Sequence, residues 1–145
     1  MRLSDISPDE TLWSLQRLSY AVEAELIGDD RIPPLHESLD DLLSEPLTWI
    51  GAFDEEERLI GAIAWSIDDD GLLDIERLVV APSAFRRGVG RTLVTEALTR
   101  AGARGALVST GRDNKPARSL YERLGFAWVE DVEVIPGLWI TRYAR

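Results

Sequence analysis

A loop rich in glycine and arginine separates a strand-like segment from a helix-like one. Residues 72–80, LLDIERLVV, are predicted to form a β-strand, and an amphipathic helical run begins at residue 89. Residues 81–91 between them contain two glycines and three arginines. Unpaired amides and the helix dipole make a helix N-terminus a favourable place for an anion. The stretch therefore predicts a phosphate-binding turn.

The residue types in this turn suit a pyrophosphate. Gly88 and Gly90 have no Cβ atom, so the backbone can approach an anion closely. Arg86, Arg87 and Arg91 can add charge-assisted hydrogen bonds. The third glycine of a dinucleotide-binding fingerprint and the lysine of a P-loop are both absent. The alternative is an ordinary surface loop, with glycines for turning and arginines for solubility.

The composition restricts the classes of partner. Sixteen basic residues against 26 acidic ones give a net charge of −10, which argues against binding to nucleic acid. No apolar run approaches the roughly 20 residues of a membrane span, and the first residues lack the apolar core of a signal peptide. Without cysteine there is no disulfide and no thiolate site. We expect a cytoplasmic protein whose arginine cluster has a small anionic partner.

The N-terminal third is predicted to be mainly helical. Ser7 is the expected N-cap of a first helix, with Glu10 completing a capping box, and Gly28 ends it. A shorter helical segment is expected over residues 35–45. The apolar face of the first helix is predicted to carry Leu12, Leu15, Leu18, Val22 and Leu26.

The remaining chain alternates strands and helices. Three strands joined by acidic turns predict an antiparallel meander, and the strand, helix and strand around the glycine-arginine turn predict a parallel pair. A further helix covers 114–126, and two strands end the chain. The fold class is α+β with a mixed sheet. The predicted strands are 47–53, 58–67, 72–80, 105–110, 126–134 and 138–144.

Two blocks of this sequence resemble the GNAT superfamily of general N-acetyltransferases. Residues 79–94, VVAPSAFRRGVGRTLV, resemble the phosphate loop Q/R-x-x-G-x-G/A, although Phe85 stands where the family usually has glutamine or arginine. Residues 114–126, NKPARSLYERLGF, resemble the segment Asn-x-x-Ala-x-x-x-Tyr followed by Gly-Phe. The matching residues are Gly88, Gly90, Asn114, Ala117, Tyr121, Gly125 and Phe126.

The resemblance implies one domain over residues 1–145, with about six to seven strands, a splayed parallel central pair and about four flanking helices. It implies transfer of an acetyl group from acetyl-CoA to an amine, without a metal. The backbone of Leu78, Val79 and Val80 would pair with the pantetheine arm, and the N–H of Val80 would stabilise the oxyanion. By the same resemblance, further cofactor contacts are Arg86, Arg87, Gly88, Val89, Gly90, Arg91, Asn114, Ala117 and Tyr121.

Catalytic roles are predicted for three side chains. Tyr121 is the expected general acid, since a phenol is protonated at neutral pH, although a core tyrosine would fit the same helix. Strand alternation places Asp74, Glu76, Leu78 and Val80 on one face. Glu76 is the expected base, with Asp74 in reserve, unless it forms a structural ion pair. Asn114 also suits an ordinary helix N-cap.

Three functions fit these observations. The first is acetylation of the primary amine of a small molecule, by direct attack in a ternary complex. The second is acetylation of protein N-termini or lysines, and the third is a CoA-binding regulator without catalysis. Tyr121 and Glu76 argue against the regulator, because binding alone requires neither. The sequence carries no signature of the acceptor, and exposed end strands leave a homodimer possible.

Overall fold

The computed structural model describes residues 1–102 and 104–145. These residues form seven strands and five α-helices, with a short 3₁₀ turn before α4. The strands are β1 (Arg2–Asp5), β2 (Thr48–Phe53), β3 (Leu59–Ile67), β4 (Leu73–Val80), β5 (Ala106–Gly111), β6 (Ala127–Ile135) and β7 (Leu138–Ala144). The helices are α1 (Glu10–Ile27), α2 (Pro33–His36), α3 (Leu39–Ser44), α4 (Val89–Ala101) and α5 (Lys115–Arg123).

All seven strands belong to one mixed sheet with the order β1-β2-β3-β4-β5-β7-β6. The pair β4–β5 is parallel, and the other five neighbouring pairs are antiparallel. The α+β class, the meander and the parallel pair predicted from the sequence are confirmed. None of the described helices combines the length and the apolar sequence that crossing a bilayer requires.

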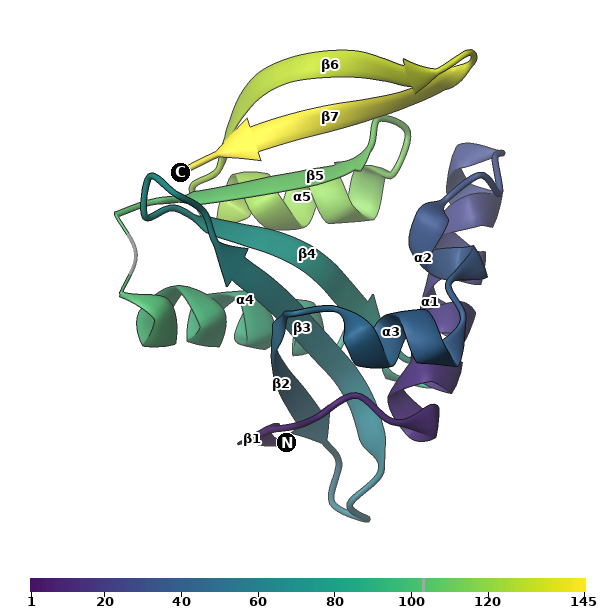
Figure 1. Ribbon diagram of the computed structural model, residues 1–145, viewed down its shortest axis with the longest axis vertical. Helices are drawn as coiled ribbons and strands as arrows, with labels where there is room; N and C mark the ends of the chain where they lie inside the picture. The colour runs from purple at the N-terminus through teal and green to yellow at the C-terminus, as the bar shows by residue number, and fades with distance from the viewer. Residues whose placement is uncertain (103) are drawn as a thin grey trace.

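The helices cover both faces of the sheet and produce two hydrophobic cores. One core joins the sheet to α4 and α5, and Leu93, Val94 and Tyr121 are buried in it. The other joins the opposite face to α1 and α3, with Leu12 and Leu42 fully buried. Figure 1 shows α1, α2 and α3 together on the right-hand side of the molecule, where the C-terminal ends of β4 and β5 lie.

The parallel strands β4 and β5 pair over only a short distance. Their register runs from Leu73 opposite Ala106 to Ile75 opposite Val108, and it stops there. In Figure 1 the two strands run side by side at their starts and separate toward α1 and α2. The second half of β4 therefore has a partner on one side, β3, and an open edge on the other.

A β-bulge lies where the two strands begin to separate. Ala64 of β3 pairs with Arg77 and Trp65 pairs with Ile75, so Glu76 has no opposite residue. A bulge inserts one residue into a strand and shifts the alternation of side chains that follows it. Glu76 thus lies at a local break in the regular geometry of β4.

The bulge overturns one expectation from the sequence. Before the bulge, the odd-numbered residue Ile75 faces the core beneath α4 and α5. After the bulge, the even-numbered residues Leu78 and Val80 face the same core. Val79 enters the opposite core. The prediction that Asp74 shares a face with Leu78 and Val80 is wrong, because strict alternation does not survive an inserted residue.

The start of α1 also differs from the prediction. Asp9, not Ser7, is the N-cap, since its Oδ1 accepts a hydrogen bond of 2.9 Å from the amide of Leu12. Aspartate is as good an N-cap as serine, so the sequence allowed either start. The predicted helical segment 35–45 is two short helices, α2 and α3, and the strand β1 was not predicted.

The predicted apolar face of α1 is only partly correct. Leu12 and Leu15 are buried, but Leu18 and Leu26 are 58% and 49% exposed. The inward face instead continues through polar positions. Its residues are Leu12, Leu15, Gln16, Ser19, Tyr20, Glu23 and Ile27.

Candidate active site

The glycine-arginine turn holds its backbone in a conformation suited to an anion. Gly88 is the N-cap of α4 with a φ of 76°, and Arg86 has a φ of 65°, which is uncommon for a residue with a side chain. Within the described residues, no acceptor is hydrogen-bonded to the amides of Gly88, Val89, Gly90 or Arg91. Four donors at the positive end of α4 are therefore free for a phosphate.

The side chains of this turn include one buried valine and three exposed arginines. Val89 is 2% exposed and fixes the start of α4 in the core. The guanidinium groups of Arg86, Arg87 and Arg91 are exposed, and no ion pair found in residues 1–102 and 104–145 involves them. Three unpaired positive charges beside four free amides fit the diphosphate of a coenzyme A.

The open edge of β4 offers further backbone groups. The amide of Ala81 donates to the carbonyl of Ile60 at 2.8 Å, and the register continues along β3 and β4 from that pair. Because antiparallel pairs alternate, the N–H and C=O groups of Leu78 and Val80 point away from β3, and those of Val79 point toward it. The N–H of Val80 donates to Ser19 Oγ of α1 at 3.2 Å.

A cavity of about 480 Å³ lies where β4 and β5 separate. Glu76, Leu78, Asn114, Ala117 and Tyr121 line it, so the structure brings together five of the residues predicted from the sequence. The glycine-arginine turn, Asp74, Val79 and Val80 lie outside its lining. The other lining residues are Tyr20, Glu23, Ile27, Arg31, Ile32, Pro33, Pro34, Ile75, Arg77, Val108, Ser109, Thr110, Gly111, Val134, Leu138 and Ile140.

Tyr121 is buried at the wall of this cavity. It is 4% exposed, and its ring contacts that of Phe126 edge to face at a centroid distance of 5.6 Å. Burial raises the pKa of the Tyr121 hydroxyl well above its usual value, with smaller contributions from Tyr20 and Glu23. A phenol in this environment is protonated at neutral pH and can donate a proton.

Two carboxylates of β4 lie next to each other at the bulge. Ser66 Oγ donates a hydrogen bond of 3.2 Å to Glu76 Oε1. Burial, together with the charge of neighbouring Glu76, raises the pKa of Asp74 to about 6. Only Glu76 of the two lines the cavity. In the part of the chain that the structure describes, no three histidine, cysteine, aspartate or glutamate residues form a group able to hold a metal ion.

Asn114 caps a helix and also lines the cavity. It is the N-cap of α5, where its Oδ1 accepts a hydrogen bond of 3.2 Å from the amide of Ala117. It is also 8% exposed and lines the cavity. Capping occupies the side-chain oxygen, and no hydrogen bond found in the described residues involves the side-chain nitrogen.

The sequence reasoning missed the contribution of α1. Ser19, Tyr20 and Glu23 extend from this helix toward β4 and β5, and the last two line the cavity. The signal was present, because these polar residues follow Leu12 and Leu15 at helical spacing. Polar residues on the inward face of an amphipathic helix indicate a functional site. The prediction followed the leucines of α1 instead and therefore did not identify these residues.

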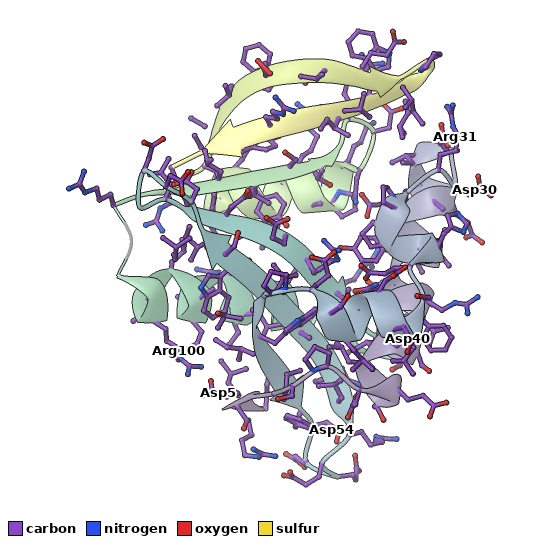
Figure 2. The ribbon with its side chains drawn as sticks, viewed as in Figure 1. Asp5, Asp30, Arg31, Asp40, Asp54 and Arg100 are labelled. Carbon is purple, nitrogen blue, oxygen red and sulfur yellow. The ribbon has the colours of Figure 1, made fainter. Side chains whose placement is uncertain are left out.

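Two segments far apart in the sequence meet beside the cavity. Arg31 follows α1 and lies near the tip of the β6–β7 hairpin (Figure 2). Its Nη2 donates to the carbonyl of Pro136 at 3.0 Å, while its Nε and Nη2 also bind Asp29. This contact joins the α1–α2 connection to the hairpin and gives Arg31 a backbone acceptor in addition to its ion pair with Asp29.

A sheet that opens beside a phosphate turn defines the fold of acetyl-CoA-dependent acyltransferases. The family model of the acetyltransferase (GNAT) family matches residues 10–126, and the chain belongs to that family. The resemblance found in the glycine-arginine turn and in the segment of Tyr121 is thereby confirmed for family and fold.

Individual relatives agree with the fold. The chain is 35% identical to UPF0157 protein YqkA of Bacillus subtilis (strain 168) over 129 residues, which cover 88% of this chain and 37% of that protein. The chain thus spans little more than a third of that relative. The PaiA N-acetyltransferase of Thermoplasma acidophilum, solved in complex with coenzyme A, has a TM-score of 0.76 at 23% identity, covering 98% of each chain. The smu.2055 protein of Streptococcus mutans UA159 has a TM-score of 0.78 at 17% identity, covering 100% of this chain and 98% of the other.

Proposed function

We propose that this protein transfers the acetyl group of acetyl-CoA to the primary amine of a small molecule. One observation supports the proposal most directly: free amides at Gly88–Arg91, the open edge of β4 and the cavity beside Tyr121 follow one another along the structure. This order matches the diphosphate, the amide-bearing arm and the thioester of one extended donor.

The donor would be held mainly by backbone groups. Amides of Gly88, Val89, Gly90 and Arg91 would bind the diphosphate, with Arg86 and Arg87 as additional cations. Leu78 and Val80 expose N–H and C=O groups that can pair with the pantetheine amides as a neighbouring strand would. The amide of Val79 is directed toward β3, so we assign it no such contact.

The reaction requires two proton transfers. The amine nitrogen forms a bond with the thioester carbonyl and gives a proton to Glu76, directly or through water. The carbon–sulfur bond then breaks, and the leaving thiolate takes a proton from Tyr121. The carbonyl oxygen would be stabilised by an amide of the open edge; at Val80, that amide must exchange its bond to Ser19.

The cavity favours a small acceptor over a peptide. It holds about 480 Å³, and Arg31 of its lining donates a hydrogen bond to the carbonyl of Pro136. An extended peptide would have to break that contact to lay its backbone across the site. A free amine attached to a compact body would not.

A panel assay tests the proposal. Incubation with acetyl-CoA and a set of small amines, amino acids and peptides should release free thiol with at least one small amine. The acetylated product should be identified by mass spectrometry. Release with peptides alone would support the protein acetyltransferase instead. Binding of coenzyme A by calorimetry without release across the panel would support the CoA-binding regulator.

A further inference from the structure

Glu23 is a carboxylate in the cavity that the proposed chemistry does not use. It lies on the inward face of α1, and its Oε1 is 3.5 Å from both Thr110 Oγ1 and the amide of Gly111 on β5. These contacts are at the long limit of a hydrogen bond. No basic side chain of the described residues forms an ion pair with Glu23.

The two arginines that line the cavity are paired with carboxylates outside its lining. Arg77 is bound to the carboxylate of Glu37 and to the carbonyl of Glu76, and Arg31 is bound to Asp29 and to the carbonyl of Pro136. Glu76 receives a neutral hydrogen bond from Ser66. Each lining arginine therefore has an anionic partner, whereas no ion pair found in the described residues involves the two lining carboxylates, Glu23 and Glu76.

Part of the remaining lining is apolar. It is formed by Ile27, Pro33, Pro34, Val134, Leu138 and Ile140. A carboxylate among apolar neighbours is stable only if a cation or several hydrogen-bond donors compensate its loss of water. Tyr20 and Tyr121 lie close enough to Glu23 that its charge raises the pKa of both hydroxyls. The ligand that completes this cavity should carry positive charge on an apolar body.

We propose that Glu23 binds a second ammonium group of the acceptor, so that the acceptor is a short alkyl diamine. This inference rests on the proposed function. One amine gives its proton to Glu76 and is acetylated, while the other stays charged against Glu23. The alkyl chain between them contacts the apolar wall. An acceptor with a carboxylate at that end would meet a like charge and be rejected.

Three compounds with the same carbon chain test this proposal. Butylamine ends in a methyl group, putrescine in a second amine and γ-aminobutyrate in a carboxylate. The protein should acetylate putrescine with a kcat/KM about tenfold or more above butylamine, the factor expected from one charge-assisted hydrogen bond. γ-Aminobutyrate should be the poorest acceptor.

Substitution of Glu23 should remove the preference. In Glu23→Gln, putrescine and butylamine should be acetylated with kcat/KM values within about twofold of each other, and the KM for acetyl-CoA should not change. Glu25→Gln is the matched control, because Glu25 is exposed two positions along α1 and does not line the cavity. An equal loss for both acceptors in Glu23→Gln, or no preference for putrescine in the unaltered protein, would overturn the proposal.

Calorimetry separates this proposal from the proposed function. Putrescine should bind the complex with coenzyme A more tightly than butylamine, and only Glu23→Gln should abolish the difference. If that holds without any acetyl transfer, the diamine site stands and the proposed reaction is wrong. If acetyl transfer occurs without a preference dependent on Glu23, the reaction stands and the diamine site is wrong.

Discussion

Arg77 Nη2 donates a hydrogen bond of 3.2 Å to Glu37 Oε2, and their side chains are only 13% and 9% exposed. Gln16 Nε2 donates to the other oxygen of Glu37 at 2.9 Å, and Trp13 Nε1 donates to its carbonyl at 2.8 Å. Glu37 thus connects α1, the α2–α3 connection and β4 just beyond the bulge. The contact fixes the wall of the cavity in which the acceptor would lie.

Breaking this pair from one side should be strongly destabilising. Arg77→Met should lower the free energy of unfolding by about 3 kcal/mol, because it leaves the Glu37 carboxylate buried without its cation. The double variant Arg77→Met with Glu37→Leu should lose much less than the sum of the two single variants. Urea unfolding measures all three, and Arg142→Met, at an exposed pair with Glu130, should change stability by less than about 0.5 kcal/mol. Additive losses in the double variant would contradict the coupling.

Removal of the Tyr121 hydroxyl should affect turnover and not donor binding. Tyr121→Phe keeps the ring against Phe126, so the fold and the affinity for acetyl-CoA should be retained. The kcat should fall about 100-fold, at the lower end of the loss expected for a missing acid. Steady-state kinetics with isothermal calorimetry gives both quantities. A kcat equal to that of the unaltered protein, with chemistry limiting the rate, would exclude Tyr121 as the acid.

The arginines of the phosphate turn should control donor affinity through charge. Arg87→Ala should weaken binding of coenzyme A by about tenfold at low salt, and the loss should shrink as salt rises. Arg100→Ala removes the same charge at the far end of α4, where Arg100 pairs with Asp5 (Figure 2), and should leave the affinity unchanged. Equal effects of the two substitutions would indicate a general charge effect instead of a site.

Asp74 predicts a pH dependence of stability. Its pKa of about 6 in the fold exceeds the usual value of 3.8, so the folded state binds its proton more tightly than the unfolded chain does. The stabilising contribution is complete below about pH 4 and is lost as the pH rises through about 6. Asp74→Asn should therefore stabilise the protein on the order of 1 kcal/mol at about pH 8, allowing for solvent screening, and have little effect at about pH 4. Thermal unfolding at the two pH values decides this, and a larger gain at the acidic value would refute it.

Local patterns in the sequence were sufficient for much of the fold. The glycine-arginine turn was predicted from Gly88 and Gly90, which lie between a strand and a helix. The end of α5 was predicted from Gly125, and the amide of Phe126 donates to the carbonyl of Tyr121 at 3.0 Å. Acidic turns between β-rich runs were enough for the meander. Each of these features depends on residues close together in the chain.

Features that depend on distant residues were not predictable in this way. The bulge at Glu76 exists only through pairing with β3, and no local pattern in DIERLVV marks it. The burial of Gln16 and the position of Glu23 in the cavity lining depend on how α1 rests on the sheet, and tertiary packing there overrode the leucine pattern. The pair of Glu37 with Arg77 joins residues 40 positions apart. The parts of the candidate site that belong to the glycine-arginine turn and to α5 were predicted. The residues that α1 contributes to the site were not.

The edge of β4 that faces away from β3 also indicates how this protein could be blocked. Its outward N–H and C=O groups accept any extended chain of amides, whatever the side chains, because backbone recognition carries little chemical selectivity. A short peptide mimic could add to this edge, where the pantetheine arm would lie. If it ended in an alkylammonium group, it would also occupy the cavity lined by Glu23 and Glu76. Such a competitor would need neither nucleotide nor thioester, and its potency would report how much of the binding energy comes from completing a sheet.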